Sequence, residues 1–266
     1  MERLEFCERY GPWAIVTGAS DGIGQACAHA LAARGLHLVL VGRREDKLRA
    51  LAQQLHSQQG VHTQVVVADL ATDAGLKALL DGTATLDVGL LVAAAGYGSA
   101  GAFLDQPLDT ELDMLTLNCR SVLAQCWHLG QRFKARGRGG MVLFGSLLGF
   151  HGTPGSANYA ATKAYVQSLA EALRVEWQAH GVDVLACAPG PVHTGFAERA
   201  GMRMGMAARP DEVAQATLDA LGRTGTVRPG VLSKLLGWSL GTAPRALRVR
   251  LMGQIMQGMT HTARSS

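Results

Sequence analysis

The sequence predicts an α/β fold, a doubly wound parallel sheet with helices on both faces. Apolar runs of strand length recur between segments of helical length and periodicity. The run 36–42 is almost continuously apolar, which is typical of a strand buried on both faces of a parallel sheet. The expected strands are 13–17, 36–42, 61–68, 88–95, 140–146 and 182–188, and the expected helices include 45–59 and 107–136.

The first expected strand leads directly into a glycine-rich turn. Gly18, Gly22 and Gly24 follow the strand 13–17 and precede a helical segment, 25–31. Strand, glycine turn and helix in this order form the phosphate-binding loop of a Rossmann-type sheet. Gly18 permits the tight turn, Gly22 lets the backbone approach a pyrophosphate, and Gly24 lets helix and strand pack closely. The spacing is Gly-x-x-x-Gly-x-Gly rather than Gly-x-Gly-x-x-Gly.

The end of the second expected strand bears on the choice of cofactor. A site for NAD usually places Asp or Glu there to bind the ribose 2′-hydroxyl. This sequence has Gly42 followed by Arg43 and Arg44, and a guanidinium pairs well with a 2′-phosphate. Glu45 and Asp46 fit as first-turn acids of the next helix. We therefore expect NADP(H), while two arginines on a solvated turn remain the alternative.

Tyr159 and Lys163 are four residues apart, with Ser146 thirteen residues before the tyrosine. Four residues are about one helical turn, so the phenol and the ammonium are expected on one helix face. A lysine cation beside a tyrosine favours the phenolate, and we expect it to lower the pKa of Tyr159 from about 10. Such a tyrosine can exchange a proton with a hydroxyl near neutral pH. Taken alone, a tyrosine and a lysine at this spacing are also typical of a solvent-exposed helix face without a function.

Together these segments resemble the short-chain dehydrogenase/reductase family, from about residue 10 to residue 222. The resemblance implies that Asn118, Ser146, Tyr159 and Lys163 are the catalytic residues. Ser146 would donate a hydrogen bond to the substrate oxygen, and Tyr159 would transfer the proton. Lys163 would lower the tyrosine pKa and bind the nicotinamide ribose. Asn118 would hold a water that relays protons.

The same resemblance implies the cofactor contacts. Segment 17–24 matches the family's cofactor loop, 189–194 its Pro-Gly-x-x-x-Thr segment beside the nicotinamide, and 69–70 its adenine-side contact. The expected cofactor-binding residues are Gly18, Ser20, Gly22, Ile23, Gly24, Arg43, Arg44, Asp69, Leu70, Gly96, Tyr159, Lys163, Val192 and Thr194. Segment 93–96 departs from the family's pattern, because it reads Ala-Ala-Ala-Gly in place of the usual Asn-Asn-Ala-Gly. Two side-chain amides that usually brace the sheet are missing, which puts the rigidity of this segment in doubt.

Residues 10–14 look most like the branch of 17β-hydroxysteroid dehydrogenases and long-chain 3-ketoacyl reductases. The implied activity is NADP(H)-dependent reduction of a ketone, or oxidation of the secondary alcohol, by hydride transfer. Three methionines in the expected lid, 195–206, and the apolar segment 147–150 favour a bulky ketoacyl or sterol-like substrate. Packing of the lid on the body would explain the methionines equally well. A non-catalytic NADP(H)-binding sensor or scaffold is the alternative function, disfavoured because all four catalytic residues are present.

Composition limits the remaining possibilities. With 266 residues, 48% of them hydrophobic, the chain supports one catalytic domain, expected over 1–230, and a helical extension over 231–266. Five cysteines without a Cys-x-x-Cys motif argue against a disulfide scaffold or a metal site and favour a reducing compartment. The first residues do not resemble a signal peptide, and no apolar run reaches the ~18 residues of a membrane span. We expect a cytoplasmic, homo-oligomeric enzyme, a dimer or a tetramer.

The basic charge is concentrated in the C-terminal extension. Residues 220–266 contain seven Arg or Lys and no Asp or Glu, whereas residues 1–219 carry a net charge of −3. Nucleic acid is not an expected partner, because these cations are not interleaved with aromatic residues. Pro244 is placed to start a helix with an apolar stripe formed by Leu247, Leu251, Met252, Ile255, Met256 and Met259. With Arg245, Arg248 and Arg250 this stripe is compatible with a helix that lies on an anionic membrane, while packing on the body or on a partner subunit stays open.

Overall fold

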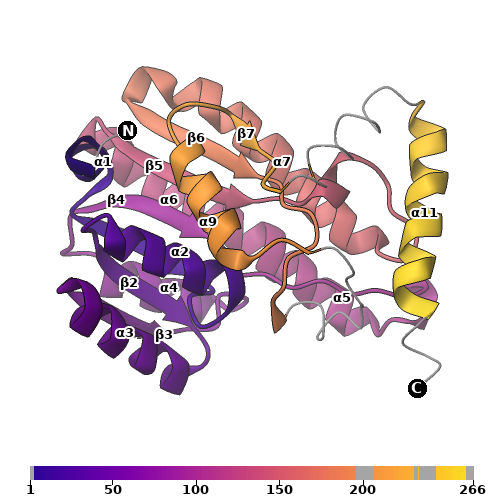
Figure 1. Cartoon of the computed structure of the whole chain (residues 1–266), viewed down its shortest axis with the longest axis horizontal. Coiled ribbons are helices and arrows are strands. Elements are labelled where there is room, and N and C mark those ends of the chain that lie inside the picture. The colour runs from indigo at the N-terminus through magenta and orange to yellow at the C-terminus, as the bar shows by residue number, and fades with distance from the viewer. Residues whose placement is uncertain (1–2, 196–206, 231–232, 234–243, 262–266) are drawn as a thin grey trace.

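The computed structural model, shown in Figure 1, describes residues 3–195, 207–230, 233 and 244–261. Within these residues seven parallel strands form one sheet in the order β3-β2-β1-β4-β5-β6-β7. The strands are β1 (Trp13–Thr17), β2 (His37–Gly42), β3 (Thr63–Val67), β4 (Val88–Ala93), β5 (Gly139–Phe144), β6 (Val182–Cys187) and β7 (Thr226–Val227). The prediction of a doubly wound parallel sheet is confirmed.

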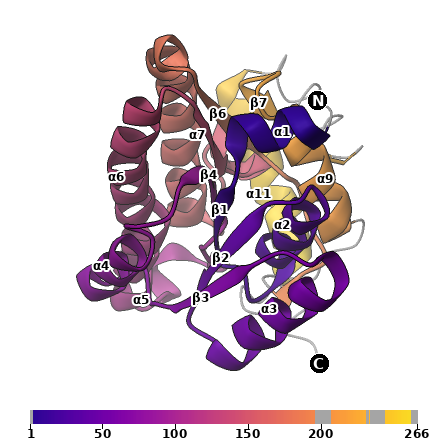
Figure 2. The ribbon, with the colours of Figure 1, turned by 90° about the vertical axis from the view of Figure 1, so that its left-hand side faces the viewer.

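Helices cover both faces of the sheet, as Figure 2 shows with the sheet seen edge-on between two layers. One layer contains α1 (Arg3–Tyr10), α2 (Gly22–Ala33), α3 (Glu45–Gln59) and α9 (Pro210–Ala220). The other contains α4 (Asp73–Gly82), α5 (Leu108–Leu115), α6 (Ser121–Arg136) and α7 (Ala157–Trp177). Short 3₁₀ turns lie at 103–105, 147–150 and 178–180.

The continuous apolar character of the strands follows from these two layers. Leu38 and Leu40 of β2 point into the core beneath α2 and α3, while Val39 and Val41 point into the core beneath α4 and α6. Successive residues of a strand face opposite sides of the sheet, so a sheet covered on both faces needs apolar residues at every position.

Each expected strand overlaps an observed one, but several ends differ; the expected strands 61–68, 88–95 and 140–146 are observed as 63–67, 88–93 and 139–144. The expected helix 45–59 is α3, and Gly60, in a left-handed conformation with φ 68°, ends it. The expected helix 107–136 is divided by a π-helical turn at Thr116–Arg120 into α5 and α6. The seventh strand, β7, was not predicted, because two residues are too few to show a periodic pattern.

The N-terminal helix is fixed to the sheet by a partly buried polar contact. The hydroxyl of Tyr10, a fully buried residue at the end of α1, donates a hydrogen bond of 2.7 Å to Oδ2 of Asp183 in β6. Arg9 pairs with the same oxygen at 2.5 Å. This contact joins residues more than 170 positions apart and closes α1 over its layer of the core.

The last described helix, α11 (Arg245–His261), lies apart from the sheet at the right-hand end of the molecule in Figure 1. It begins directly after Pro244, as predicted. Met252 and Met256 are buried, whereas Leu247, Leu251 and Ile255 remain 47%, 37% and 42% exposed. The expected apolar stripe is therefore divided between a face packed on the body and a face open to solvent. The side chain of Met259 lies outside the described residues.

Candidate active site

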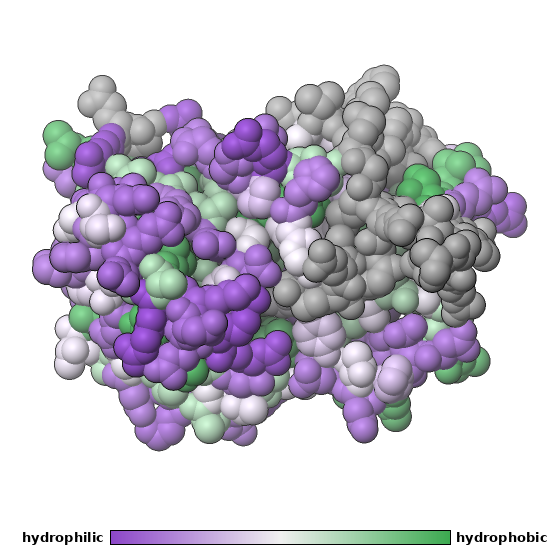
Figure 3. All heavy atoms as spheres, turned by 60° about the horizontal axis from the view of Figure 1, so that its bottom comes forward, coloured by the Kyte–Doolittle hydropathy of each residue, from purple (hydrophilic) through white to green (hydrophobic). Residues whose placement is uncertain are grey.

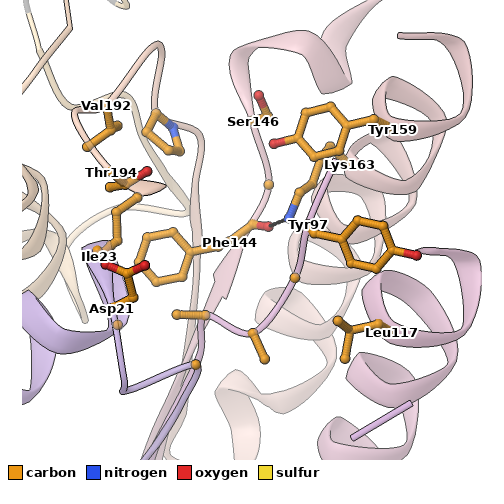
Figure 4. A pocket seen from close by; sticks show the side chains of 18 of the residues that line it. Asp21, Ile23, Tyr97, Leu117, Phe144, Ser146, Tyr159, Lys163, Val192 and Thr194 are labelled. Carbon is orange, nitrogen blue, oxygen red and sulfur yellow. Dashed lines mark hydrogen bonds between the residues drawn. The ribbon is translucent and has the colours of Figure 1, made fainter. Parts of the chain in front are cut away.

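A cavity of about 1030 Å³ lies at the carboxyl ends of the strands. It is lined by every residue predicted for catalysis or cofactor binding except Asn118. The glycine turn, the ends of β2, β4 and β5, the first turns of α7 and the segment 189–194 all reach it. Figure 4 shows these elements converging, with Ser146, Tyr159 and Lys163 on one side and Asp21, Ile23 and Thr194 on the other.

The structure brings three of the predicted catalytic side chains together. Tyr159 and Lys163 lie one turn apart on α7, each 8% exposed. Ser146 precedes the 3₁₀ turn 147–150, and its oxygen accepts a hydrogen bond of 3.2 Å from the backbone N–H of Leu148. The Tyr159 hydroxyl lies beside the Ser146 side chain in Figure 4, and the two side chains interact by a hydrogen bond. Nζ of Lys163 donates a hydrogen bond of 2.8 Å to the carbonyl oxygen of Phe144.

The expected direction of the Tyr159 pKa is wrong for this arrangement. Burial raises the pKa of Tyr159 to about 12, and a hydrogen bond with Ser146 offsets part of that rise. The reason is geometric, because Nζ of Lys163 lies 5.6 Å from the centroid of the phenol ring and bonds to Phe144. Burial also lowers the pKa of Lys163 to about 8. At neutral pH the phenol therefore carries its proton and most of the lysine is charged.

Asn118 lies behind the cavity wall, in the π-helical turn between α5 and α6. It is 1% exposed, and its amide donates to the carbonyl oxygen of Tyr97 at 2.8 Å and to Oγ1 of Thr162 at 3.1 Å. Its oxygen accepts from the backbone N–H of Tyr97 at 3.2 Å. Asn118 thus braces the segment after β4. Its role in a proton relay stays a prediction.

The glycine turn packs as closely as its sequence predicts. Gly18 has φ 66°, and a Cβ there would lie 2.9 Å from the backbone nitrogen of Ala95. A Cβ on Gly24 would lie 2.3 Å from the carbonyl oxygen of Gly18. Only glycine fits at either position, so a backbone-lined hollow forms at the N-terminus of α2, the geometry that binds a phosphate.

The replaced asparagines after β4 are compensated by other contacts. The backbone N–H of Ala95 donates to Oγ1 of Thr17 at 3.2 Å, and Asn118 holds both backbone groups of Tyr97. These contacts fix the segment on either side of Gly96. Contacts from Thr17 and Asn118 therefore brace this segment in place of the missing asparagine side chains.

The two arginines after β2 take different positions at the far end of the cavity. Arg44 donates to Oγ of Ser20 at 3.0 and 3.2 Å, and it lies 3.4 Å from Oδ2 of Asp21. Arg43 has a side chain 68% exposed and lies 3.6 Å from Oδ2 of Asp69. Oγ of Ser20 lies 3.5 Å from the place of a Cβ on Gly42, which has no side chain, and both residues line the cavity together with the two arginines. A phosphate attached to an adenosine ribose would find cationic donors here and no carboxylate at Gly42.

Apolar side chains also line the cavity. They include Leu147 and Leu148, which follow Ser146, and three residues of α11: Met252, Ile255 and Met256. Tyr97 lines it beside Thr110 and Asp113, and its hydroxyl lies 2.8 Å from the carbonyl oxygen of Thr110 and 3.2 Å from Oδ2 of Asp113. The sequence did not single out Tyr97, although its place directly after Gly96 at a strand end was a usable signal. Most of the expected lid, 196–206, lies outside the described residues.

Two candidate types of site have no support in the described part of the chain. No group of three His, Cys, Asp or Glu residues there is placed to hold a metal ion. No described helix is long and apolar enough to cross a membrane.

Comparison with known proteins places the chain among oxidoreductases. A family model described as short chain dehydrogenase matches residues 12–204. A 7beta-hydroxysteroid dehydrogenase of Clostridium sardiniense is 35% identical over 191 residues, 72% of this chain and 73% of the relative. A very-long-chain 3-oxoacyl-CoA reductase of Phaeosphaeria nodorum is 33% identical over 240 residues, 87% of this chain and 69% of the relative.

A solved structure agrees with these relatives. The short-chain dehydrogenase from Sphingobium yanoikuyae in complex with NADPH superposes with a TM-score of 0.80 at 30% identity, covering 89% of this chain and 98% of that one. The expected family is confirmed, and so is the resemblance to hydroxysteroid dehydrogenases and long-chain ketoacyl reductases.

Proposed function

The chain belongs to the short-chain dehydrogenase/reductase family and is an oxidoreductase acting on CH–OH donors, and we propose that it uses NADP(H) to interconvert a bulky, apolar ketone and its secondary alcohol. One observation carries this proposal. One cavity is lined by Ser146, Tyr159 and Lys163, by the glycine turn with Arg43 and Arg44, and by apolar side chains of the segment 147–148 and of α11.

The polar side chains suit the reducing direction. When bound, the nicotinamide supplies the hydride. Ser146 accepts a hydrogen bond from Leu148, so its own hydrogen can be donated to the carbonyl oxygen as negative charge develops there. Tyr159 carries its proton at neutral pH and can transfer it from Oη to that oxygen. The ammonium of Lys163 then stabilises the phenolate that remains.

The preference for NADP(H) rests on the adenosine end of the cavity. Gly42 offers no carboxylate to a ribose 2′-hydroxyl, and Ser20, Arg43 and Arg44 offer donors to a 2′-phosphate. A related structure with bound NADPH supports the assignment. An enzyme that bound NADH more tightly than NADPH would contradict it.

The substrate class rests on the apolar side chains of the cavity and on the relatives. Hydroxysteroids and very-long-chain 3-oxoacyl thioesters, the substrates that the relatives' names give, share a large apolar body beside the reacting carbonyl or hydroxyl. We test the class with a ketone panel: a fused-ring steroid ketone, a 3-oxoacyl thioester and cyclohexanone. NADPH consumption is followed and the alcohol product is identified by mass spectrometry. Turnover of a bulky ketone supports the proposal, and absence of turnover with every bulky ketone rejects it.

The surface supports two further proposals about partners. Leu123 and Trp127 on α6 are 47% and 60% exposed, and we propose that they contribute to contacts between subunits of a homo-oligomer. Sedimentation velocity tests this: a monomer at micromolar concentration contradicts it. The five unpaired cysteines fit a reducing compartment, and we propose a cytoplasmic location.

The solvent-facing side of α11 supports peripheral membrane contact. Leu247 and Leu251 are exposed there, close to the exposed Arg245 and Arg250. Figure 3 shows hydrophobic side chains at the right-hand end of the molecule, the end at which Figure 1 places α11. Flotation with anionic vesicles tests the proposal, and Leu251→Gln is expected to reduce binding. Full recovery of the parent in the soluble fraction at low salt contradicts it.

A further inference from the structure

A buried carboxyl group that the proposed proton transfer does not use lies close to the active site. Glu111 of α5 is 6% exposed, and it is the only buried acidic residue in the part of the chain that the structure describes. Its Oε1 accepts a hydrogen bond of 2.7 Å from Oγ of Ser99, whereas its Oε2 is buried without a hydrogen-bond partner among the described residues. A buried oxygen that accepts no hydrogen bond costs stability. A gain in stability therefore does not account for Glu111.

Ser99 belongs to the segment that follows β4 and carries Tyr97 into the cavity wall. From 93 to 96 this segment reads Ala-Ala-Ala-Gly and has no polar side chain of its own. Its next residues are held from outside, because Asn118 bonds both backbone groups of Tyr97 and Glu111 bonds the side chain of Ser99. Glu111 and Asn118 thus hold the segment 97–99 at two neighbouring points.

The same contacts reach the first turn of α7. Oγ of Ser156, the residue before α7, donates to the carbonyl oxygen of Ser99 at 2.7 Å. Nδ2 of Asn158 donates to the carbonyl oxygen of Glu111 at 2.9 Å. These two hydrogen bonds and the bond from Ser99 to Glu111 form a closed ring, which we call the Glu111 ring. The ring fixes the chain directly before Tyr159 against the segment after β4.

We infer that Glu111 is a positioning residue for proton transfer by Tyr159. Its carboxyl group holds Ser99, and through Ser99 the start of α7, so that Oη of Tyr159 keeps its place beside Ser146. Figure 4 shows Tyr97 and Tyr159 on the same side of the cavity, the side that the Glu111 ring joins together. A misplacement of about 1 Å can lower a rate ~100-fold, because the reacting atoms must be aligned. The inference rests on the proposed ketone reduction and adds a residue that acts through Tyr159.

The first test removes the carboxyl group and then restores its acceptor oxygen. In Glu111→Ala the hydroxyl of Ser99 loses its partner, so kcat for the best bulky ketone should fall about 5- to 20-fold, with KM and the Kd for NADPH within about twofold. Glu111→Gln keeps an oxygen that can accept from Ser99, so its kcat should stay within about twofold of the parent. The fall of kcat/KM near pH 8 should stay at the same pH in both variants, because Lys163 is unchanged.

The second test is a double-mutant cycle on the bond between Glu111 and Ser99. Ser99→Ala removes the donor, so it should lower kcat as much as Glu111→Ala does. The double variant should lose no more than either single variant, because all three lack the same bond. Tyr10→Phe is the control for lost stability. It breaks a hydrogen bond to Asp183 away from the cavity, so Tm should fall while kcat, measured well below Tm, stays within about twofold.

Hydrogen exchange tests the Glu111 ring without turnover. Peptides covering 97–101 and 156–160 contain the residues that the ring joins, apart from Glu111 itself. In Glu111→Ala their backbone amides should exchange at least about threefold faster than in the parent, because local opening becomes easier. In Glu111→Gln they should exchange at the rate of the parent.

The outcomes separate this inference from the proposed function. A kcat loss in Glu111→Gln as large as in Glu111→Ala, multiplied losses in the double variant, or an equal kcat loss in Tyr10→Phe would overturn the inference. If Glu111→Ala does not fold, Ser99→Ala decides, and a kcat equal to that of the parent overturns the inference. Unchanged exchange in a folded Glu111→Ala overturns the inference alone, whereas a parent that reduces no ketone overturns the proposed function.

Discussion

Replacing Arg43 by alanine is expected to change the choice between the two nicotinamide cofactors. Arg43 lines the cavity beside Gly42, and its nearest carboxylate is Asp69 at 3.6 Å. The variant removes a cation from the place expected for the 2′-phosphate. Arg44 and its bonds to Ser20 remain in place.

The size of the effect follows from the exposure of the side chain. Arg43 is 68% exposed, so its pairing with Asp69 contributes at most about 1 kcal/mol to the free energy of unfolding, and we expect a change smaller than that. A hydrogen bond to a charged group contributes about 1.5–3 kcal/mol, and solvent screening places Arg43 at the lower end. A loss of about 1.5–2 kcal/mol raises the Kd for NADPH roughly 10- to 30-fold. NADH lacks the 2′-phosphate, so its Kd should stay within about twofold of the parent.

The assay is fluorescence titration of both cofactors at fixed ionic strength. Arg49→Ala is the matched control, because Arg49 is 69% exposed, pairs with Glu45 at 2.6 Å and does not line the cavity. It removes the same charge from α3, the helix that follows Arg43 and Arg44. Equal losses for NADPH and NADH in Arg43→Ala, or an equal loss for NADPH in Arg49→Ala, would refute the proposed phosphate contact.

Two further outcomes are expected. The kcat/KM of ketone reduction should fall as the pH rises through about 8, because Lys163 loses its charge there. Tyr159 has a pKa of about 12 and keeps its proton over this range. Lys163→Arg should move the fall to higher pH. A profile with no fall up to pH 10 would contradict this assignment. Tyr10→Phe removes the hydrogen bond to Asp183, so it should lower the free energy of unfolding by about 1–2 kcal/mol and Tm by about 2–6 °C. In the control Tyr165→Phe, whose side chain is partly exposed, Tm should change by less than about 1 °C. Equal Tm values for parent and Tyr10→Phe would show that the bond is dispensable.

Local spacing made most of the site predictable. The glycine turn can be recognised in the sequence because its requirements are local. Gly18 adopts a left-handed φ, and Gly24 allows a close approach of the backbone. Tyr159 and Lys163 can be recognised as a pair because a spacing of one helical turn places them on one helix face. The alternation of apolar runs and helical segments was sufficient to predict the parallel sheet, because helices cover both of its faces and its strands are therefore apolar throughout.

The features that the sequence did not show depend on contacts between distant segments. The pKa of Tyr159 is set by burial among several elements, so the neighbouring Lys163 in the sequence gave the wrong direction. The bracing role of Asn118 depends on a π-helical turn that brings its amide to Tyr97. The place of Met252 in the cavity depends on the approach of Gly253 to Pro154, and no local pattern shows that contact.

The most direct test of the central claim is a comparison of the parent with Tyr159→Phe. The phenylalanine ring retains the packing of the tyrosine but has no proton to transfer. Reduction of the best bulky ketone is measured as NADPH consumption with identification of the alcohol, beside the Kd for NADPH. We predict that kcat falls at least about 100-fold while the Kd stays within about threefold. A variant that retains kcat within about tenfold of the parent would contradict the assignment of Tyr159 as the proton donor.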